Sequence, residues 1–124
     1  MSKALKKLRT ELLTSALEDW VPLTEVETVI SYFQLADSRD VRQELALRTI
    51  RSLVEDGLME IGDLPTEGTR LIAWNLSLDE AMSRLRERYV EHYDEPAQWD
   101  FSIWLGLTES GERVAKELVD EART

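Results

Sequence analysis

Apolar residues recur at helical spacing along the first half of the chain. Over residues 3–18 they form one stripe with polar residues between them, which predicts an amphipathic helix. The stripe resumes over residues 24–34, after Pro22, which ends helical structure. Thr24 followed by Glu27 has the spacing of a capping box, so a second helix is predicted to begin there.

A third helix is predicted over residues 38–56, with Asp37 or Ser38 as its cap and Gly57 as its stop. When the residues of this helix are placed 100° apart around its axis, they divide into a face toward the core and an outer face. The predicted core face consists of Ala46, Leu47, Ile50, Leu53 and Val54. The predicted outer face consists of Val41, Glu44, Leu45, Arg48, Arg51, Ser52 and Glu55.

The second half of the chain mixes strand and helix patterns. Residues 58–63 and 70–75 are predicted as two strands joined by a tight turn in "PTEG". A helix is predicted over residues 78–92, because Ser77 and Glu80 form a second capping-box pattern at its start.

Alternation of apolar and polar residues in "WDFSIWLGL" predicts a last strand over residues 99–106. A capped C-terminal helix is predicted over residues 109–121. These elements predict one domain, residues 1–124, that is mainly α with a small antiparallel sheet (α+β). The inward side of the last strand is predicted to hold Trp99, Phe101, Ile103, Leu105 and Leu107.

The segment "RTIRSLVEDGLMEIGD", with the later "WLGLTESGERVAKEL", resembles the winged helix-turn-helix superfamily of MarR-like and PadR-like architecture. The chain as a whole also resembles small actinobacterial proteins. The superfamily resemblance implies a winged-helix-like domain whose third helix reads the major groove of DNA. The helix predicted at 78–92 departs from simple winged helices, which run directly from the wing to the last strand.

The charge balance opposes DNA binding. The chain has 15 Lys and Arg against 25 Asp and Glu, a net charge of -10. Nucleic-acid binding draws much of its affinity from cations that neutralise phosphates, so an acidic domain is poorly suited to it. Residues 1–10 are the exception, because they contain Lys3, Lys6, Lys7 and Arg9 and no carboxylate.

The candidate DNA-binding residues are Arg42, Arg48, Arg51 and Arg70. On a helix, Glu44 lies one turn before Arg48 and Glu55 lies one turn after Arg51. These spacings predict that both arginines are paired with carboxylates, which would oppose phosphate.

The segment "EHYDEPAQWD" combines aromatic and acidic residues around a proline, a composition suited to a protein interface. A place in the core is the favoured interpretation of Trp99, with an interface role as the alternative. Val41 and Leu45 lie one turn apart outside the core stripe of the third predicted helix. There they either pack under the helix predicted at 78–92 or contact a partner. The candidate partner-binding residues are Glu91, Tyr93, Asp94, Glu95, Trp99, Asp100, Val41 and Leu45.

Catalytic patterns are missing from the sequence. The chain has no cysteine, and its single histidine, His92, is not part of a metal-binding or nucleophile-activating motif. We expect no enzyme activity, no cofactor and no metal. The N-terminal segment lacks the continuous apolar core of a signal peptide, and no stretch is long and apolar enough for a membrane span, so a cytoplasmic location is expected.

The sequence therefore favours a non-catalytic, acidic protein-interaction module, either a monomer or a homodimer. Its most concrete version is an immunity-like or antitoxin-like inhibitor of a basic partner such as a nuclease toxin. The alternative is a winged-helix transcriptional regulator that binds DNA.

Overall fold

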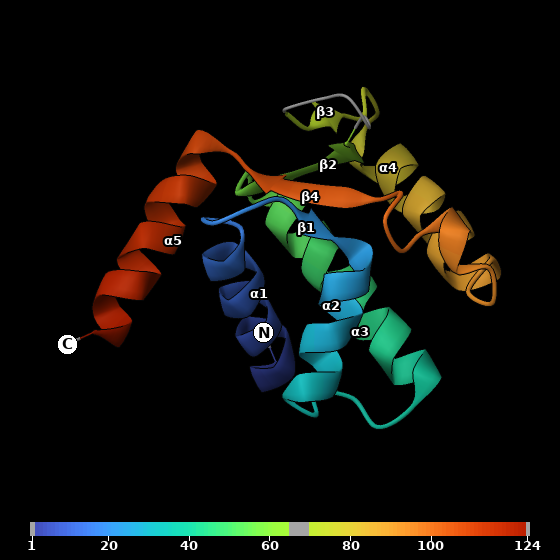
Figure 1. The fold of residues 1–124 in the computed structure, drawn as a ribbon, viewed down its shortest axis with the longest axis horizontal. Coiled ribbons are helices and arrows are strands. Elements are labelled where there is room, and N and C mark those ends of the chain that lie inside the picture. The colour runs from blue at the N-terminus through green and yellow to red at the C-terminus, as the bar shows by residue number, and fades with distance from the viewer. Residues whose placement is uncertain (1, 65–69, 124) are drawn as a thin grey trace.

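Three helices and a small sheet form the centre of the molecule. The computed structural model describes residues 2–64 and 70–123 of the chain. In Figure 1 the sheet lies across the upper ends of the three helices. The chain is a mainly helical α+β domain, as predicted. The central helices are α1 (Lys3–Ser15), α2 (Leu23–Tyr32) and α3 (Arg39–Glu55).

The sheet is antiparallel, and its strands run in the spatial order β1-β4-β2-β3. The last strand in the chain, β4, therefore lies in the middle, where Leu105 is paired with Val21 on one side and Ile61 on the other. All three of these side chains are buried against the helices. The strands are β1 (Val21–Pro22), β2 (Met59–Asp63), β3 (Ile72–Ala73) and β4 (Trp104–Leu107).

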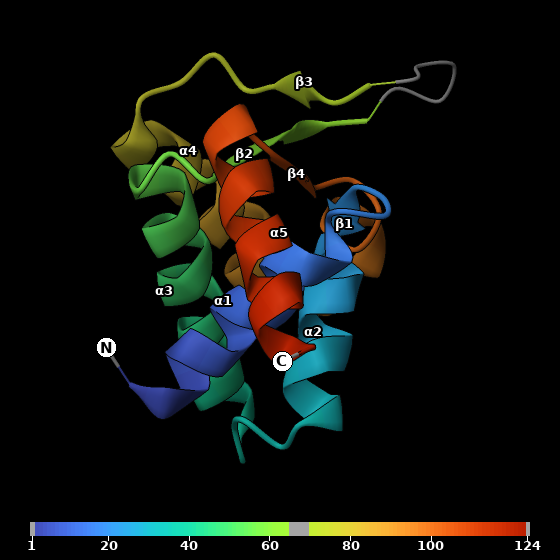
Figure 2. The ribbon, with the colours of Figure 1, turned by 90° about the vertical axis from the view of Figure 1, so that its left-hand side faces the viewer.

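Two further helices flank this centre at opposite ends (Figure 1). Helix α4 (Leu78–Arg86) lies beside α3 and continues into a π-helical turn, η1 (Glu87–Glu91), and a short 3₁₀ turn, η2 (Pro96–Gln98), precedes β4. Helix α5 (Glu109–Ala122) packs on α1, and Figure 2 shows it crossing the outer side of that helix. The helix predicted between residues 70–75 and the last strand is thus present.

The predicted ends of α3 and the start of α4 are confirmed. The Ser38 hydroxyl accepts from the Val41 amide at 3.2 Å, and Gly57 follows α3 with φ of 72°, a conformation that favours glycine. At α4, the Ser77 hydroxyl accepts from the Glu80 amide while the Glu80 carboxylate accepts from the Ser77 amide. This reciprocal capping box starts the helix as the sequence predicts.

The "LT-x-x-G" segment joins α5 to the end of α3. The Thr108 hydroxyl donates to the carbonyl of Gly57 at 2.6 Å and accepts from the amide of Gly111 at 3.0 Å. A Cβ at Gly111 would lie 1.8 Å from the Leu58 carbonyl oxygen, so only glycine fits this approach. The motif therefore fixes where α5 leaves the sheet.

Two predictions about the first two helices are wrong. Helix α1 ends at Ser15 rather than at residue 18. The capping box of Thr24 and Glu27 does not form, because the cap position of α2 is Pro22 and has no side-chain hydrogen bond. The Glu27 carboxylate instead accepts from two tyrosine hydroxyls far along the chain.

The predicted strands 70–75 and 99–106 are shorter in the structure. The first is reduced to Ile72–Ala73 and the second to Trp104–Leu107, because only these residues find ladder partners. Phe101, predicted to face inward, is 63% exposed. The predicted turn "PTEG" lies outside the described residues. Within 2–64 and 70–123, no helix combines the length and the apolar character needed to cross a bilayer.

Candidate functional site

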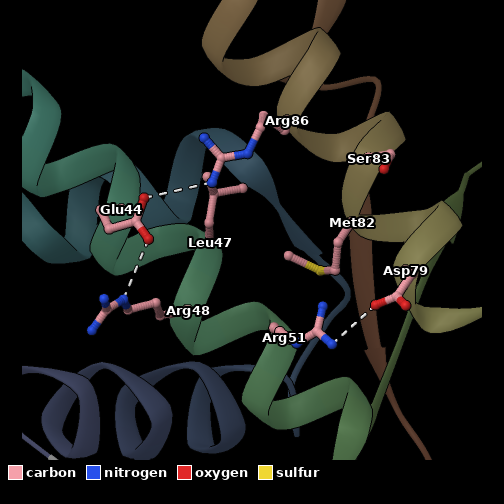
Figure 3. Close-up of a pocket in the computed structure, with 8 residues that line it drawn as sticks. All are labelled: Glu44, Leu47, Arg48, Arg51, Asp79, Met82, Ser83 and Arg86. Carbon is pink, nitrogen blue, oxygen red and sulfur yellow. Dashed lines mark hydrogen bonds and ion pairs between the residues drawn. The ribbon is translucent and has the colours of Figure 1, made fainter.

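Helices α3 and α4 enclose a hollow of about 360 Å³, which we call the α3–α4 hollow. Arg48 and Arg51, two of the candidate DNA-binding residues, both line it. Figure 3 shows the hollow between the two helices, with a dashed contact from each of these arginines to a carboxylate. Its lining residues are Glu44, Leu47, Arg48, Arg51, Asp79, Met82, Ser83 and Arg86.

The intrahelical ion pairs predicted for α3 are both formed. The Arg48 Nε lies 3.3 Å from the Glu44 Oε1, and the Arg51 Nε lies 3.8 Å from the Glu55 Oε2. Each arginine therefore has a carboxylate on its own helix face, where a phosphate would have to compete with it.

Two more ion pairs cross from α3 to α4. The Arg51 Nη2 lies 3.0 Å from the Asp79 Oδ1, and the Arg86 Nη2 lies 3.6 Å from the Glu44 Oε2 (Figure 3). Beneath them α4 buries Ala81 and Leu85 in the core. Helix α4 is thus held along the flank of α3 by apolar burial, with the ion pairs at its margin.

The other two candidate DNA-binding residues lie elsewhere. Arg42 faces α2, where its Nε is 3.9 Å from the Glu27 Oε2, and its side chain is mostly buried. Arg70 is exposed and precedes β3. The four arginines therefore do not form one surface.

Carboxylates gather on the turn that follows α4. Glu87, Glu91, Asp94 and Glu95 are all exposed, and we call these four residues the acidic surface. Asp94, whose side chain is 89% exposed, lies 3.7 Å from the Arg39 guanidinium. Glu95 contacts His92 at 2.7 Å, and this neighbour is cationic when the imidazole is protonated.

The contact with Glu95 also sets the charge of the histidine. A hydrogen bond from His92 Nδ1 to the Glu95 carboxylate raises the pKa of the imidazole, and nearby Glu87 and Glu91 act in the same direction. Asp100, another candidate residue, has a local role: its Oδ1 accepts from the Phe101 amide at 2.6 Å.

The aromatic members of the candidate interface, Tyr93 and Trp99, pack against each other, and Tyr93 is half-buried. Trp99 is buried and stacks on Tyr93 with ring centroids 5.2 Å apart, and its indole N–H donates to the Tyr93 carbonyl at 3.1 Å. The ring edge of Tyr89 meets Trp99 as well. The favoured prediction, that Trp99 belongs to the core, is confirmed, so this residue is not an exposed interface anchor.

A carboxylate that the sequence analysis assigned to a helix cap holds this aromatic cluster in place. The Tyr89 hydroxyl donates to Glu27 Oε2 at 2.6 Å, and the Tyr93 hydroxyl donates to Glu27 Oε1 at 2.5 Å. Burial raises the pKa of both hydroxyls, and the neighbouring carboxylate raises it further, so both remain donors. The spacing of the two tyrosines, one helical turn apart, was the available signal for a shared acceptor.

Val41 and Leu45 line a different hollow, of about 400 Å³, between α1 and α3. Leu5 and Leu35 also line it, so Val41 and Leu45 face α1 and do not pack under α4. Leu45 is 8% exposed, which corrects its predicted place on the outer face, whereas Val41 is 49% exposed.

In the part of the chain that the structure describes, no three His, Asp or Glu side chains are placed to hold a metal ion together. Comparison with protein-family models, curated proteins and solved structures gives no match to this chain.

Proposed function

We propose that this protein is a non-catalytic interaction module that binds a basic protein partner through its acidic surface. The observation that carries the proposal is the position of α4. This helix lies along α3 and contributes Asp79 to Arg51, while Glu44 of α3 is shared by Arg48 and Arg86. Arg48 and Arg51, the arginines of α3 that line the α3–α4 hollow, are thus already paired with carboxylates, which opposes phosphate binding there and favours binding through the exposed carboxylates that follow α4.

The distribution of charge supports a basic partner. The net charge of -10 gives long-range attraction to a cationic protein, which raises the association rate and selects against acidic partners. The acidic surface places four exposed carboxylates on a segment that is tied to α2, because Tyr89 and Tyr93 of that segment donate hydrogen bonds to Glu27.

The most concrete version of the proposal is an immunity-like or antitoxin-like inhibitor of a nuclease toxin. A nuclease must present a basic surface to bind its own phosphate-rich substrate. A compact acidic protein can occupy that surface by charge complementarity and block access to the substrate.

Complex formation with the products of neighbouring genes tests the proposal. Each purified product is mixed with this protein and analysed by size-exclusion chromatography at low and at moderate salt. The proposal expects a stable complex with a basic product, with affinity that falls as salt rises, because salt screens exposed charges. Failure of every neighbouring product to form a complex at low salt contradicts it.

A DNA-binding regulator is the second candidate, and the order of elements supports it. Helices α2 and α3 are joined by a short turn, and the β2–β3 pair follows α3, which is the arrangement expected for a winged helix. Arg48 also remains largely exposed. A mobility-shift assay with the DNA upstream of its own gene, at low and at moderate salt, separates the candidates, since the interaction module is expected to give no shift.

A further inference from the structure

Beside the acidic surface, the outer face of α2 and the segment before β4 line a shallow, open hollow of about 490 Å³, which we call the α2 hollow. The two segments are tied together by backbone hydrogen bonds from Leu23 to Ile103 and from Thr24 to Asp100, and they run next to each other in Figure 1. The lining residues are Thr24, Glu27, Thr28, Ser31, Tyr32 and Trp99.

We propose that the α2 hollow receives an arginine side chain of the basic partner. This inference rests on the proposed function and specifies one contact of the complex, that between a partner arginine and the α2 hollow. Three features of the lining carry it: a largely enclosed carboxylate, an exposed aromatic ring and hydroxyl groups with acceptor capacity to spare.

The carboxylate is that of Glu27, whose side chain is mostly buried yet lines the hollow. Each of its oxygens accepts one tyrosine hydroxyl, and an ionised carboxylate offers about four acceptor positions, so about two remain. Arg42 is the cation nearest to these acceptor positions. Its Nε lies 3.9 Å from Glu27 Oε2, too far for a hydrogen bond, and no acceptor in the described structure binds that N–H. Charge–charge attraction is stronger here than at an open surface, because the site is partly shielded from water.

The ring and the hydroxyls suit a guanidinium group. Tyr32 is 78% exposed, and within the described residues neither its hydroxyl nor that of Ser31 forms a hydrogen bond. A planar guanidinium can stack on an aromatic ring while its five N–H groups donate to several acceptors at once. An ammonium group has three donors and no plane, so arginine should be preferred to lysine.

Negative charge also lies on the segment that borders the hollow. Asp100 follows Trp99 in the chain, its side chain is half-buried, and its backbone carbonyl accepts from the Thr24 amide. Its carboxylate accepts from the Phe101 amide and does not line the hollow, so it contributes only longer-range attraction to a cation.

Titration with N-acetyl-argininamide, followed by amide and indole NMR shifts, tests the inference. N-acetyl-citrullinamide is the matched control, since it has nearly the same shape without the charge. We expect saturable shifts at Thr28, Ser31, Tyr32 and the Trp99 indole, with a dissociation constant on the order of 1 mM and at least about tenfold weaker binding of the citrulline compound. Equal shifts with both compounds, or shifts confined to other residues, overturn the inference.

Two surface variants sharpen the test without disturbing the core. Tyr32→Ala should weaken binding of the arginine compound by about fivefold or more, and Thr28→Lys should abolish it by placing a cation at the mouth. Phe101→Ala removes another exposed ring, one that is near the hollow but does not line it, and should leave binding unchanged. Unaltered binding by Tyr32→Ala contradicts the inference.

The outcomes for the α2 hollow and for the proposed function are distinguishable. If the arginine compound binds as described while no protein complex forms, the proposed function fails and the binding site stands. If a protein complex forms and Tyr32→Ala keeps its full affinity, the proposed function stands and the arginine site fails.

Discussion

Arg51 of α3 and Asp79 of α4, which are 28 residues apart in the chain, are joined by an ion pair of 3.0 Å between the two helices. This contact links a residue that the sequence analysis named as a candidate DNA contact to the helix that precedes η1. Because Arg51 also contacts Glu55, its guanidinium is paired with two carboxylates in the protein without a ligand.

The Arg51–Asp79 pair should contribute little to stability. Both side chains are substantially exposed, and exposed ion pairs are typically worth about 0.2–1 kcal/mol. A double-mutant cycle of Arg51→Ala and Asp79→Ala, measured by urea unfolding, should give a coupling energy in that range. A coupling above about 2 kcal/mol would show that the pair, rather than apolar burial, holds α4 in place.

Apolar burial by α4 should dominate instead. Leu85 is fully buried, and truncating a buried leucine costs about 2–5 kcal/mol. Leu85→Ala is therefore expected to lower the free energy of unfolding by that amount, whereas Ser83→Ala, at an exposed position of the same helix, should change it by less than about 0.5 kcal/mol. Equal effects of the two variants would mean that α4 is not packed on the core.

The two capping boxes predicted from the sequence should respond differently to mutation. Ser77→Ala removes a cap that is formed and should cost about 0.5–2 kcal/mol. Thr24→Ala removes no cap and should cost less, since the Thr24 hydroxyl does not cap α2. A larger loss for Thr24→Ala in thermal or urea unfolding would contradict the assigned start of α2.

Glu27 should be more important for stability than its neighbour Glu25. Glu27→Ala leaves the hydroxyls of Tyr89 and Tyr93 without their acceptor, at a cost of about 1–3 kcal/mol for each one that stays unpaired. Glu25→Ala removes one acceptor, that of the partly buried Ser15 hydroxyl, and should cost less than about 1 kcal/mol. Comparable losses for the two variants in urea unfolding would exclude the shared-acceptor arrangement.

The charge state of His92 should depend on Glu95. The hydrogen bond to Glu95 raises the pKa of His92 in the folded protein, so its stabilising contribution is complete below the unfolded value of about 6.5 and is lost as pH rises through the higher folded value. Glu95→Gln should lower the pKa of this histidine, which is the single one in the chain and can be followed by NMR. An unchanged pKa would show that the contact is not maintained in solution.

Local signals allowed most of the helices to be predicted. Ser38, Ser77 and Thr108 cap helices, and Gly57 ends one, through contacts within a few residues of themselves, so these roles could be inferred from spacing alone. The hydrogen bond between Thr108 and Gly57 could not, because the two residues are far apart in the chain. The ends of α2 to α5, counting η1 with α4, agree with the predicted limits to within two residues.

The errors arose where a distant partner competes with a local pattern. Glu27 fits a cap by spacing, but two tyrosines more than sixty residues away bind its carboxylate. Trp99 fits an alternating strand, but it stacks on Tyr93 and takes its segment out of the sheet.

The candidate site was predicted less completely than the fold. The pairing of Arg48 with Glu44 follows from helical spacing, and the acidic residues of the turn are exposed as an interface requires. The α2 hollow could not be predicted, because it forms between α2 and a segment about seventy residues later in the sequence.

The most direct measurement compares the affinity of the basic partner for two charge-reversed variants by calorimetry. One variant, Glu91→Lys/Asp94→Lys/Glu95→Lys, reverses three residues of the acidic surface. The other, Glu109→Lys/Glu117→Lys/Asp120→Lys, makes the same change in net charge on the exposed side of α5. We expect the first variant to lose at least about a hundredfold in affinity, because three facing charges become repulsive, and the second to lose much less. Equal losses for the two variants, or full affinity in the first, would contradict the proposed function.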